Sequence, residues 1–324
     1  MKRIFWVLLV LGIVSHAFSL AVLPDSAYSD TAYHLTQIKR ATTATYELDL
    51  MELPLYYFLS TPVALAFPMG FPFTKIMPAL VTAALFYFSY LLFRREFGEN
   101  YIIPLAFMAN IPILIRYGSV NYVGVFAAAC LMAALYFRDG FSIMPVLVSK
   151  ANAALVGLFM FVPEQLRRNS FYGFTGVSLV ALALIDWASS YLSFFDFPPA
   201  SAFSKFAVLK GIAYEPAAML FCVMTLFIFI AIIEGLWKRR ESTYAFCFMF
   251  LFSITALCGV FWFYKLEFLY VRWLIPVIPL ISVFYADGLL SSDYRNTILA
   301  STILYCAYSF AMTTISAASY GGLL

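Results

Sequence analysis

The sequence has few charged residues for its length. Lysine, arginine, aspartate and glutamate make up 11% of the 324 residues, whereas 64% are hydrophobic, and the mean hydropathy is +0.89. A soluble domain carries about a quarter charged residues and about half apolar ones. So few charges cannot cover the surface of a water-soluble protein of this size. The sequence therefore predicts a polytopic membrane protein.

Other features that are scarce exclude further classes of protein. The formal net charge is only +3 and the basic residues are scattered, which excludes nucleic-acid binding as the main function. No polar stretch is longer than about 30 residues, whereas a separate soluble domain needs about 50. The five cysteines lie in apolar segments at no metal-like spacing, so they predict buried thiols and no disulfide framework.

Long apolar runs predict an all-α membrane bundle of about 10–11 transmembrane helices in one integral membrane domain, residues 1–324. Residues 1–23 form the first membrane helix, for which a cleaved signal peptide is the alternative. Residues 24–72 form a long outer loop with juxtamembrane helices, because prolines interrupt its apolar part, 54–72. The bundle over residues 73–318 is expected to contain helices at 73–93, 101–116 and 120–137, a short broken pair at 141–150 and 151–166, and helices at 171–195, 215–237, 243–264, 272–290 and 296–318.

The positions of lysine and arginine set the orientation. This arrangement places eleven basic residues in the inner gaps and eight in the outer ones and leaves Lys75 unassigned, and the clusters Arg94-Arg95, Arg167-Arg168 and Lys238-Arg239-Arg240 all lie inside. We therefore expect a multi-pass protein of the cell membrane with a cytoplasmic N-terminus. The long first loop and the C-terminus are then outside.

The first loop contains the sequence Ser29-Asp30-Thr31-Ala32-Tyr33-His34. Asp30 and His34 are four residues apart, so they share a face of a helix. The apolar side of this helix would lie on the membrane and consists of Tyr33, Leu35 and Ile38. Asp30 can accept a proton from a hydroxyl nucleophile or bind a divalent cation such as magnesium or manganese. The alternative is a loop helix that Asp30 caps, with Thr31 as its first residue.

Two basic residues are candidates for binding a phosphate. Lys150 stands at the break between two short helices, about ten apolar residues after Arg138, where a buried ammonium requires an anion. Arg272 stands at the outer end of a helix that contains two prolines, and arginine binds phosphate bidentately. The alternatives are a lysine that reaches the membrane surface and an interfacial belt of aromatic and basic residues.

Two polar residues fall within expected membrane helices. Asp186 lies in the middle of residues 171–195, and an intramembrane carboxylate is a functional candidate that can also be structural. His16 lies in the first helix, where we expect a hydrogen-bonded core histidine.

The order of the motifs is more specific than any one of them. An acidic D-x-A-Y-H-L loop is followed by P-L-Y-Y, R-R-x-F-G, S-K-x-N-A-A-L and V-R-W-L-I-P-V-I-P-L. Over residues 1 to about 290 this order resembles the GT-C superfamily of membrane glycosyltransferases. The superfamily includes protein O-mannosyltransferases, aminoarabinose transferases and uncharacterised archaeal and bacterial relatives. The resemblance implies a GT-C-like fold.

The resemblance also implies roles for individual residues. Asp30 corresponds to the essential aspartate of the first outer loop, although Thr31 follows it where the family often has a second acidic residue. Lys150 and Arg272 correspond to basic residues near the lipid phosphate. An acidic residue is usual after the third span, and this chain has Asn121 there. The implied substrate-binding residues are Lys150, Arg272, His34, Tyr33, Asn121 and Arg116.

The implied activity is transfer of a sugar from a polyprenyl-phosphate donor to an acceptor hydroxyl on the outer face of the membrane, with inversion. Asp30 would act as the general base or as part of a metal-assisted activator. The acceptor is a glycan, a lipid or a protein. Two alternatives remain: a non-enzymatic carrier of lipids or lipid-linked sugars, and a catalytically inactive GT-C-like scaffold that binds a partner.

Overall fold

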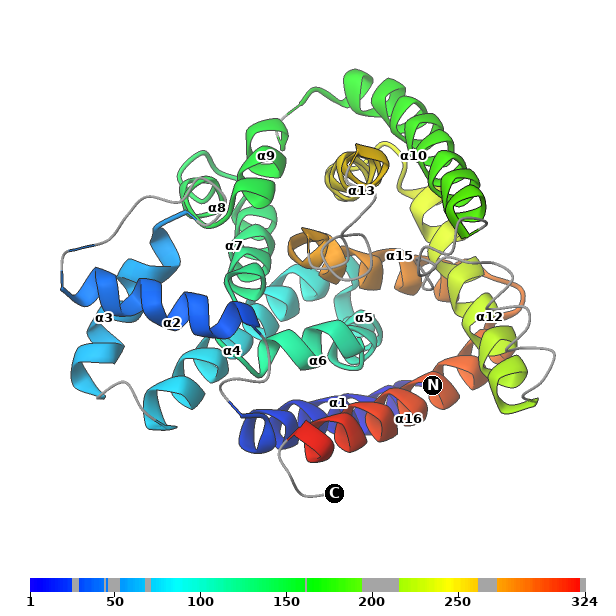
Figure 1. Ribbon diagram of the computed structural model, residues 1–324. Helices are drawn as coiled ribbons and strands as arrows, with labels where there is room; N and C mark the ends of the chain where they lie inside the picture. The colour runs from blue at the N-terminus through cyan, green and yellow to red at the C-terminus, as the bar shows by residue number, and fades with distance from the viewer. Residues whose placement is uncertain are drawn as a thin grey trace. The chain divides into compact units, whose positions relative to one another are not determined.

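The computed structural model describes residues 1–24, 29–43, 45, 53–67, 71–160, 162–193, 216–261 and 273–320 (Figure 1). Within these ranges every regular element is a helix, which confirms the predicted all-α class. The helices are α1 (Lys2–Val22), α2 (Ser29–Thr42), α3 (Leu55–Ala66), α4 (Phe71–Phe97), η1 (Gly98–Asn100), α5 (Ile102–Ala109), α6 (Pro112–Gly118), α7 (Val123–Phe137), α8 (Met144–Leu147), α9 (Ala151–Phe159), α10 (Glu164–Ser193), α12 (Pro216–Lys238), α13 (Thr243–Phe261), η3 (Ile275–Val277), α15 (Ile278–Ser291) and α16 (Arg295–Tyr320).

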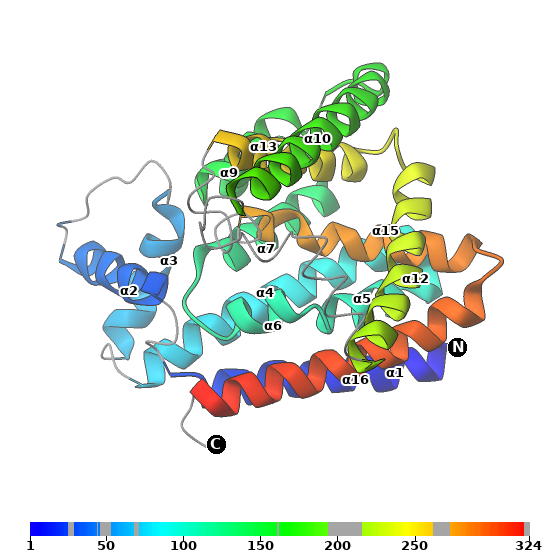
Figure 2. The ribbon, with the colours of Figure 1, turned by 45° about the vertical axis from the view of Figure 1, so that its right-hand side comes forward.

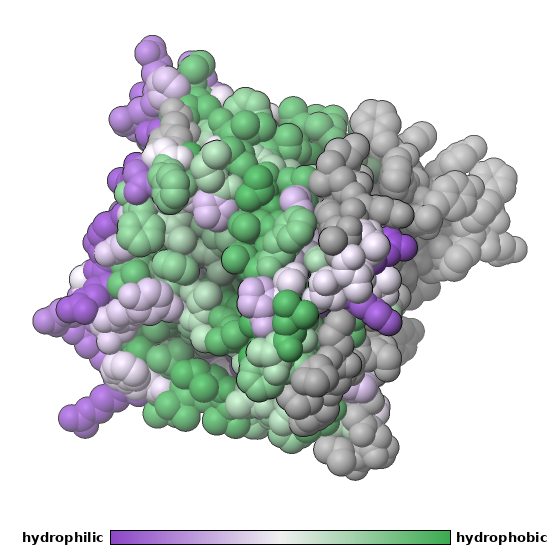
Figure 3. All heavy atoms as spheres, turned by 90° about the vertical axis from the view of Figure 1, so that its left-hand side faces the viewer, coloured by the Kyte–Doolittle hydropathy of each residue, from purple (hydrophilic) through white to green (hydrophobic). Residues whose placement is uncertain are grey.

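Several of these helices have the length and composition of membrane spans. Three qualify singly: Lys2–Val22, Phe73–Asn100 and Arg295–Ser319. Two bent pairs qualify jointly: Pro112–Gly118 with Val123–Phe137, at 112°, and Thr225–Lys238 with Thr243–Cys258, at 117°. One face of the molecule carries a broad hydrophobic surface, with hydrophilic residues along one border (Figure 3). The described residues thus provide three to five helices that could cross a membrane, which indicates a membrane protein.

The expected span 101–116 is broken in the structure, and the short broken pair expected at 141–150 and 151–166 has other bounds. Residues 101–116 form α5 and α6, because the chain turns at Asn110, whose side-chain amide donates to the carbonyl oxygens of Leu8 (2.8 Å) and Ala106 (2.9 Å). Of residues 141–150 only the four residues of α8 are helical. The helix expected at 151–166 ends at Phe159, and α10 begins at Glu164, earlier than predicted, directly after Pro163, which suits a helix start.

The described chain forms two compact units. Unit 1 comprises Met1–Leu158, Ile281–Val283 and Cys306–Leu324, and unit 2 comprises Phe159–Leu280 and Phe284–Tyr305. In unit 1, α1 packs on α5 and α6, α4 packs on α7, and α2 and α3 lie together beside α4 (Figures 1 and 2). The pairing of α2 with α3 positions the candidate site.

Charged residues join three helix ends in unit 1. Lys2, at the start of α1, pairs with Glu99 in η1 at 2.8 Å, and Arg138, just after α7, pairs with Glu96 near the end of α4 at 3.5 Å. Arg95 donates to the carbonyl oxygen of Leu135 at 3.0 Å. Such exposed pairs add little stability. They do bring together the basic residues that the sequence assigns to one side of the membrane.

Unit 2 contains a close helix contact. A Cβ atom on Gly235 of α12 would lie 1.8 Å from the carbonyl oxygen of Phe284 in α15, and one on Gly288 would lie 1.8 Å from that of Ala231. Glycine permits this approach, as small residues do in membrane helix pairs. Arg239 at the end of α12 forms an ion pair with Asp287 of α15. Elsewhere in this unit α10 packs on α13.

Candidate functional site

The helix α2 has one buried face. The residues of this buried face follow helical spacing and are His34, Gln37, Ile38 and Ala41. Tyr33 is 36% exposed, and Leu35 is half-buried. Of the expected apolar side, Ile38 belongs to the buried face, whereas Tyr33 and Leu35 flank it, because successive residues are about 100° apart. That this side lies on the membrane stays a prediction.

His34 is the polar centre of this face. It is 1% exposed, and its Nδ1 atom lies 2.9 Å from the hydroxyl oxygen of Tyr57, which is fully buried in α3. Among the described residues, the Nε2 atom of His34 and the Oε1 atom of Gln37 are buried without a hydrogen-bond partner. Buried polar atoms usually have partners, so these two atoms are available to a bound ligand.

Lys150 approaches the same place from the segment before α9. It is 6% exposed, and its ammonium donates to the hydroxyl oxygen of Tyr122 at 3.3 Å and lies 4.7 Å from the centre of that ring. The ring of Tyr122 in turn lies 5.5 Å from that of His34. This burial is what the sequence predicts for a lysine that faces the bundle, and it excludes the alternative of a lysine that reaches the surface.

A second pair of hydrogen bonds joins α3 and α4 to the segment just before α7. The hydroxyl of Tyr56 donates to Oδ1 of Asn121 at 3.0 Å, and Nδ2 of Asn121 donates to the carbonyl oxygen of Thr74 at 3.3 Å. Asn121 is 1% exposed. Its side chain therefore holds elements together within the cluster. We call this group the His34–Lys150 cluster; it consists of His34, Tyr56, Tyr57, Asn121, Tyr122 and Lys150.

Burial determines the protonation state of His34. Desolvation lowers the pKa of His34 to about 3, and the positive charge of Lys150 acts in the same direction. The imidazole is therefore neutral at physiological pH and offers hydrogen bonds without charge. Lys150 supplies the positive charge of the cluster.

The structure brings together three of the predicted site residues, His34, Asn121 and Lys150. The ring of Tyr33 lies 5.5 Å from that of His34 but faces the surface. Arg116 is half-buried in the last turn of α6, next to Tyr117, whose ring lies 4.7 Å from that of Tyr122.

The structure describes the backbone of Asp30 but not its side chain. Because α2 begins at Ser29, Asp30 lies in its first turn, so the alternative in which Asp30 caps a helix that begins at Thr31 is wrong. The side chains of Asp30 and of Asp186, which is in α10, lie outside the described residues, as does Arg272 altogether.

The sequence analysis missed Gln37, Tyr56, Tyr57 and Tyr122 as members of the site or its border. Gln37 had a signal, since it lies three residues after His34 and therefore on the same helix face. Apart from the P-L-Y-Y motif, no sequence signal marked the tyrosines as site residues, because tyrosine is common at every membrane interface.

The described residues contain no group of three or more His, Cys, Asp or Glu side chains that could hold a metal ion. The predicted cation at Asp30 stays a prediction. Chemically, the cluster combines a buried cation, which suits an anion such as a phosphate, with neutral hydrogen-bonding atoms and aromatic rings. Comparisons with protein-family models, curated proteins and solved structures find no match for this chain.

Proposed function

We propose that this chain is a membrane glycosyltransferase of the GT-C type, which moves a sugar from a polyprenyl-phosphate donor to an acceptor hydroxyl with inversion. The observation that carries the proposal is the burial of Lys150 beside His34. His34 is on α2, the helix that also contains Asp30. A buried cation interacts strongly with an anion because the surroundings screen it poorly. Neighbouring neutral polar atoms suit the hydroxyl groups of a sugar.

The proposed reaction assigns a part to each residue. Lys150, with Arg272, binds the phosphate of the donor and stabilises the charge that grows on it. Nε2 of His34 and Oε1 of Gln37 bind sugar hydroxyls. Asp30 takes the proton from the acceptor hydroxyl while the oxygen of that hydroxyl attacks the anomeric carbon of the sugar. The bond from that carbon to the phosphate oxygen breaks, and polyprenyl phosphate leaves with the electron pair.

The proposal includes an arrangement in the membrane. A GT-C-like bundle of about 10–11 spans would place the N-terminus in the cytoplasm and the His34–Lys150 cluster at the outer face. The ion pairs of Lys2 with η1 and of Arg138 with the end of α4 support it, since they gather basic residues at one end of unit 1. The cluster involves other helix ends: the start of α7 and the loop helices α2 and α3.

The test is sugar transfer in proteoliposomes that contain the purified protein, polyprenyl-phosphate mannose or glucose with a radiolabelled sugar, and an alkyl glycoside whose free hydroxyl groups serve as the acceptor. We expect Asp30→Asn to lower the rate at least about 100-fold, the usual contribution of a general base. The matched control is Asp293→Asn, at an exposed aspartate, which keeps full activity. Full activity of Asp30→Asn would remove Asp30 from the chemistry. Labelled donor that crosses the bilayer without bond formation would instead identify a carrier.

A further inference from the structure

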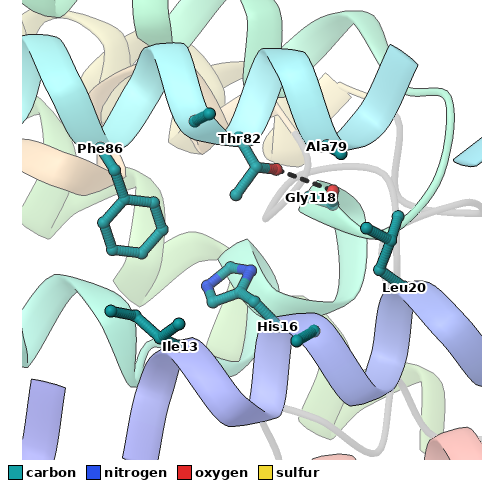
Figure 4. Close-up of a pocket in the computed structure, with 9 residues that line it drawn as sticks. Ile13, His16, Leu20, Ala79, Thr82, Phe86 and Gly118 are labelled. Carbon is teal, nitrogen blue, oxygen red and sulfur yellow. Dashed lines mark hydrogen bonds between the residues drawn. The ribbon is translucent and has the colours of Figure 1, made fainter. Parts of the chain in front are cut away.

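Unit 1 contains a pocket of about 310 Å³ that the proposed reaction does not use. It lies between α1, α4 and the end of α6 (Figure 4). Its lining residues are almost all apolar and are Ile13, His16, Ala17, Leu20, Ala79, Thr82, Ala83, Phe86 and Gly118. This volume is at the lower end of the range for small-molecule sites, and apolar walls with few polar groups are typical of them.

His16 is the unusual member of this lining. It is 8% exposed, its ring points into the pocket, and it meets the ring of Phe86 edge-on at 5.3 Å (Figure 4). Neither ring nitrogen makes a hydrogen bond to any described residue. The expected hydrogen-bonded core histidine is thus buried but lacks the bond. Because an unpaired buried polar group is unfavourable, the site is incomplete as it stands.

The surroundings of the ring indicate which partner is missing. The backbone of Ala109 lies near enough to the imidazole to interact with it, but the contact does not reach the geometry of a hydrogen bond. A carbonyl only accepts, so the ring N–H is the group that suits it. The second nitrogen of a neutral imidazole is an acceptor, and it needs a donor.

The other polar side chain of the pocket is already used. The hydroxyl of Thr82 donates to the carbonyl oxygen of Gly118 at 2.8 Å (Figure 4). A buried water needs about two to four polar partners, and this lining has too few free groups to hold one. Ile13 is 49% exposed on α1, so the pocket can be reached from the hydrocarbon around that helix. The missing donor therefore belongs to a mostly apolar molecule.

We propose that this pocket binds a neutral apolar molecule with one hydroxyl group, of the long-chain alcohol type, whose hydroxyl donates a hydrogen bond to the imidazole of His16. The chain of this ligand lies along the apolar walls and continues into the membrane. The site is separate from the His34–Lys150 cluster and does not depend on the glycosyltransferase proposal.

The experiment uses the full chain in lipid nanodiscs and a long-chain primary alcohol with a photoreactive diazirine in its chain. The comparison probe is the methyl ether of the same alcohol, which can accept a hydrogen bond but cannot donate one. Labelled peptides are identified by mass spectrometry. We expect saturable labelling of residues 13–20 and 79–86, with the alcohol binding about tenfold more tightly than the ether. A tenfold ratio corresponds to about 1.4 kcal/mol, the value of one good hydrogen bond.

Variants then test the residue. His16→Phe keeps an aromatic ring and removes the acceptor, so the preference for the alcohol should disappear. Ser15→Ala, at the adjacent buried position of α1, is the matched control and should keep the preference. Equal labelling by alcohol and ether in the unmodified protein, or labelling that does not saturate, would overturn the proposal. Both of these outcomes are measured on the unmodified protein, so the proposal can be tested even if His16→Phe fails to fold.

Discussion

The two histidines of the chain are both buried in unit 1, but their surroundings differ. His34 is bonded to Tyr57 at 2.9 Å and lies within a cluster of polar side chains that includes a cation. His16 is enclosed by apolar residues and has no hydrogen bond to the part of the chain that the structure describes. One histidine is part of a polar network, and the other is an isolated polar group.

The difference separates two ways in which a membrane protein can keep a polar side chain inside. A buried polar group is tolerated where the fold itself supplies hydrogen bonds, as it does through Tyr57 for His34. Where the fold does not, the group either weakens the protein or is completed by a ligand. His34 should therefore matter for stability in the absence of any ligand, whereas His16 should not.

The largest expected effect follows directly. His34→Leu removes the buried bond to Tyr57, so the free energy of unfolding should fall by about 1–3 kcal/mol. His16→Leu removes an unbonded polar group from apolar surroundings, so it should leave stability unchanged within about 0.5 kcal/mol or raise it. The measurement is thermal unfolding of both variants in the same detergent.

The result that contradicts the comparison is an equal loss in both variants. It would mean that His16 has a stabilising partner and that its pocket is complete. Ser15→Ala controls for any change in α1 itself, because the substitution lies next to His16 and removes only a small hydroxyl.

The next effect concerns pH. Burial first, and then the charge of Lys150, lowers the pKa of His34 from about 6.5 in the unfolded chain to about 3 in the folded one. As the pH falls, His34 therefore takes up a proton at a higher pH in the unfolded chain than in the folded one. The stability that a neutral His34 contributes is complete above pH 6.5. It is lost as the pH falls towards 3, by about 1.4 kcal/mol per unit at most.

His34→Gln removes this titration. Between pH 7.5 and pH 5 the unmodified protein should lose about 2 kcal/mol more stability than the variant does. Chemical denaturation at a series of pH values in one detergent measures this difference. Parallel pH profiles for the two proteins would show that His34 is not held neutral by its surroundings.

The sequence predicted the helical class, because this follows from a local feature, the apolar runs. It left a buried and a surface-reaching Lys150 as alternatives, and the structure shows the buried one. The sequence also grouped Lys2, Arg95 and Arg138 at one side, and these residues do gather at one end of unit 1. The break at Asn110 had a local signal in Pro112, which begins α6, but the bond from Asn110 to Leu8 was not predictable, because Leu8 is far away in the sequence.

The buried face of α2 shows why the site was only partly predicted. His34 and Gln37 are polar, so hydropathy alone assigns them to an exposed surface, whereas the apolar Tyr33 is the one that faces outward. Which polar residues are buried depends on α3, which packs on this face and supplies Tyr57. Similarly, the partner of Lys150 is Tyr122, and no local pattern relates the two residues.

The smallest expected effect measures the bond between His34 and Tyr57 itself. Tyr57→Phe and His34→Leu each remove one partner from a buried pair, whereas the double variant removes both and leaves two apolar groups in contact. The double variant should therefore be more stable than the sum of the single losses predicts, by about 1 kcal/mol. Thermal unfolding of the four proteins gives this coupling energy. Strict additivity would mean that the two side chains do not interact and that the polar network around Lys150 does not include His34.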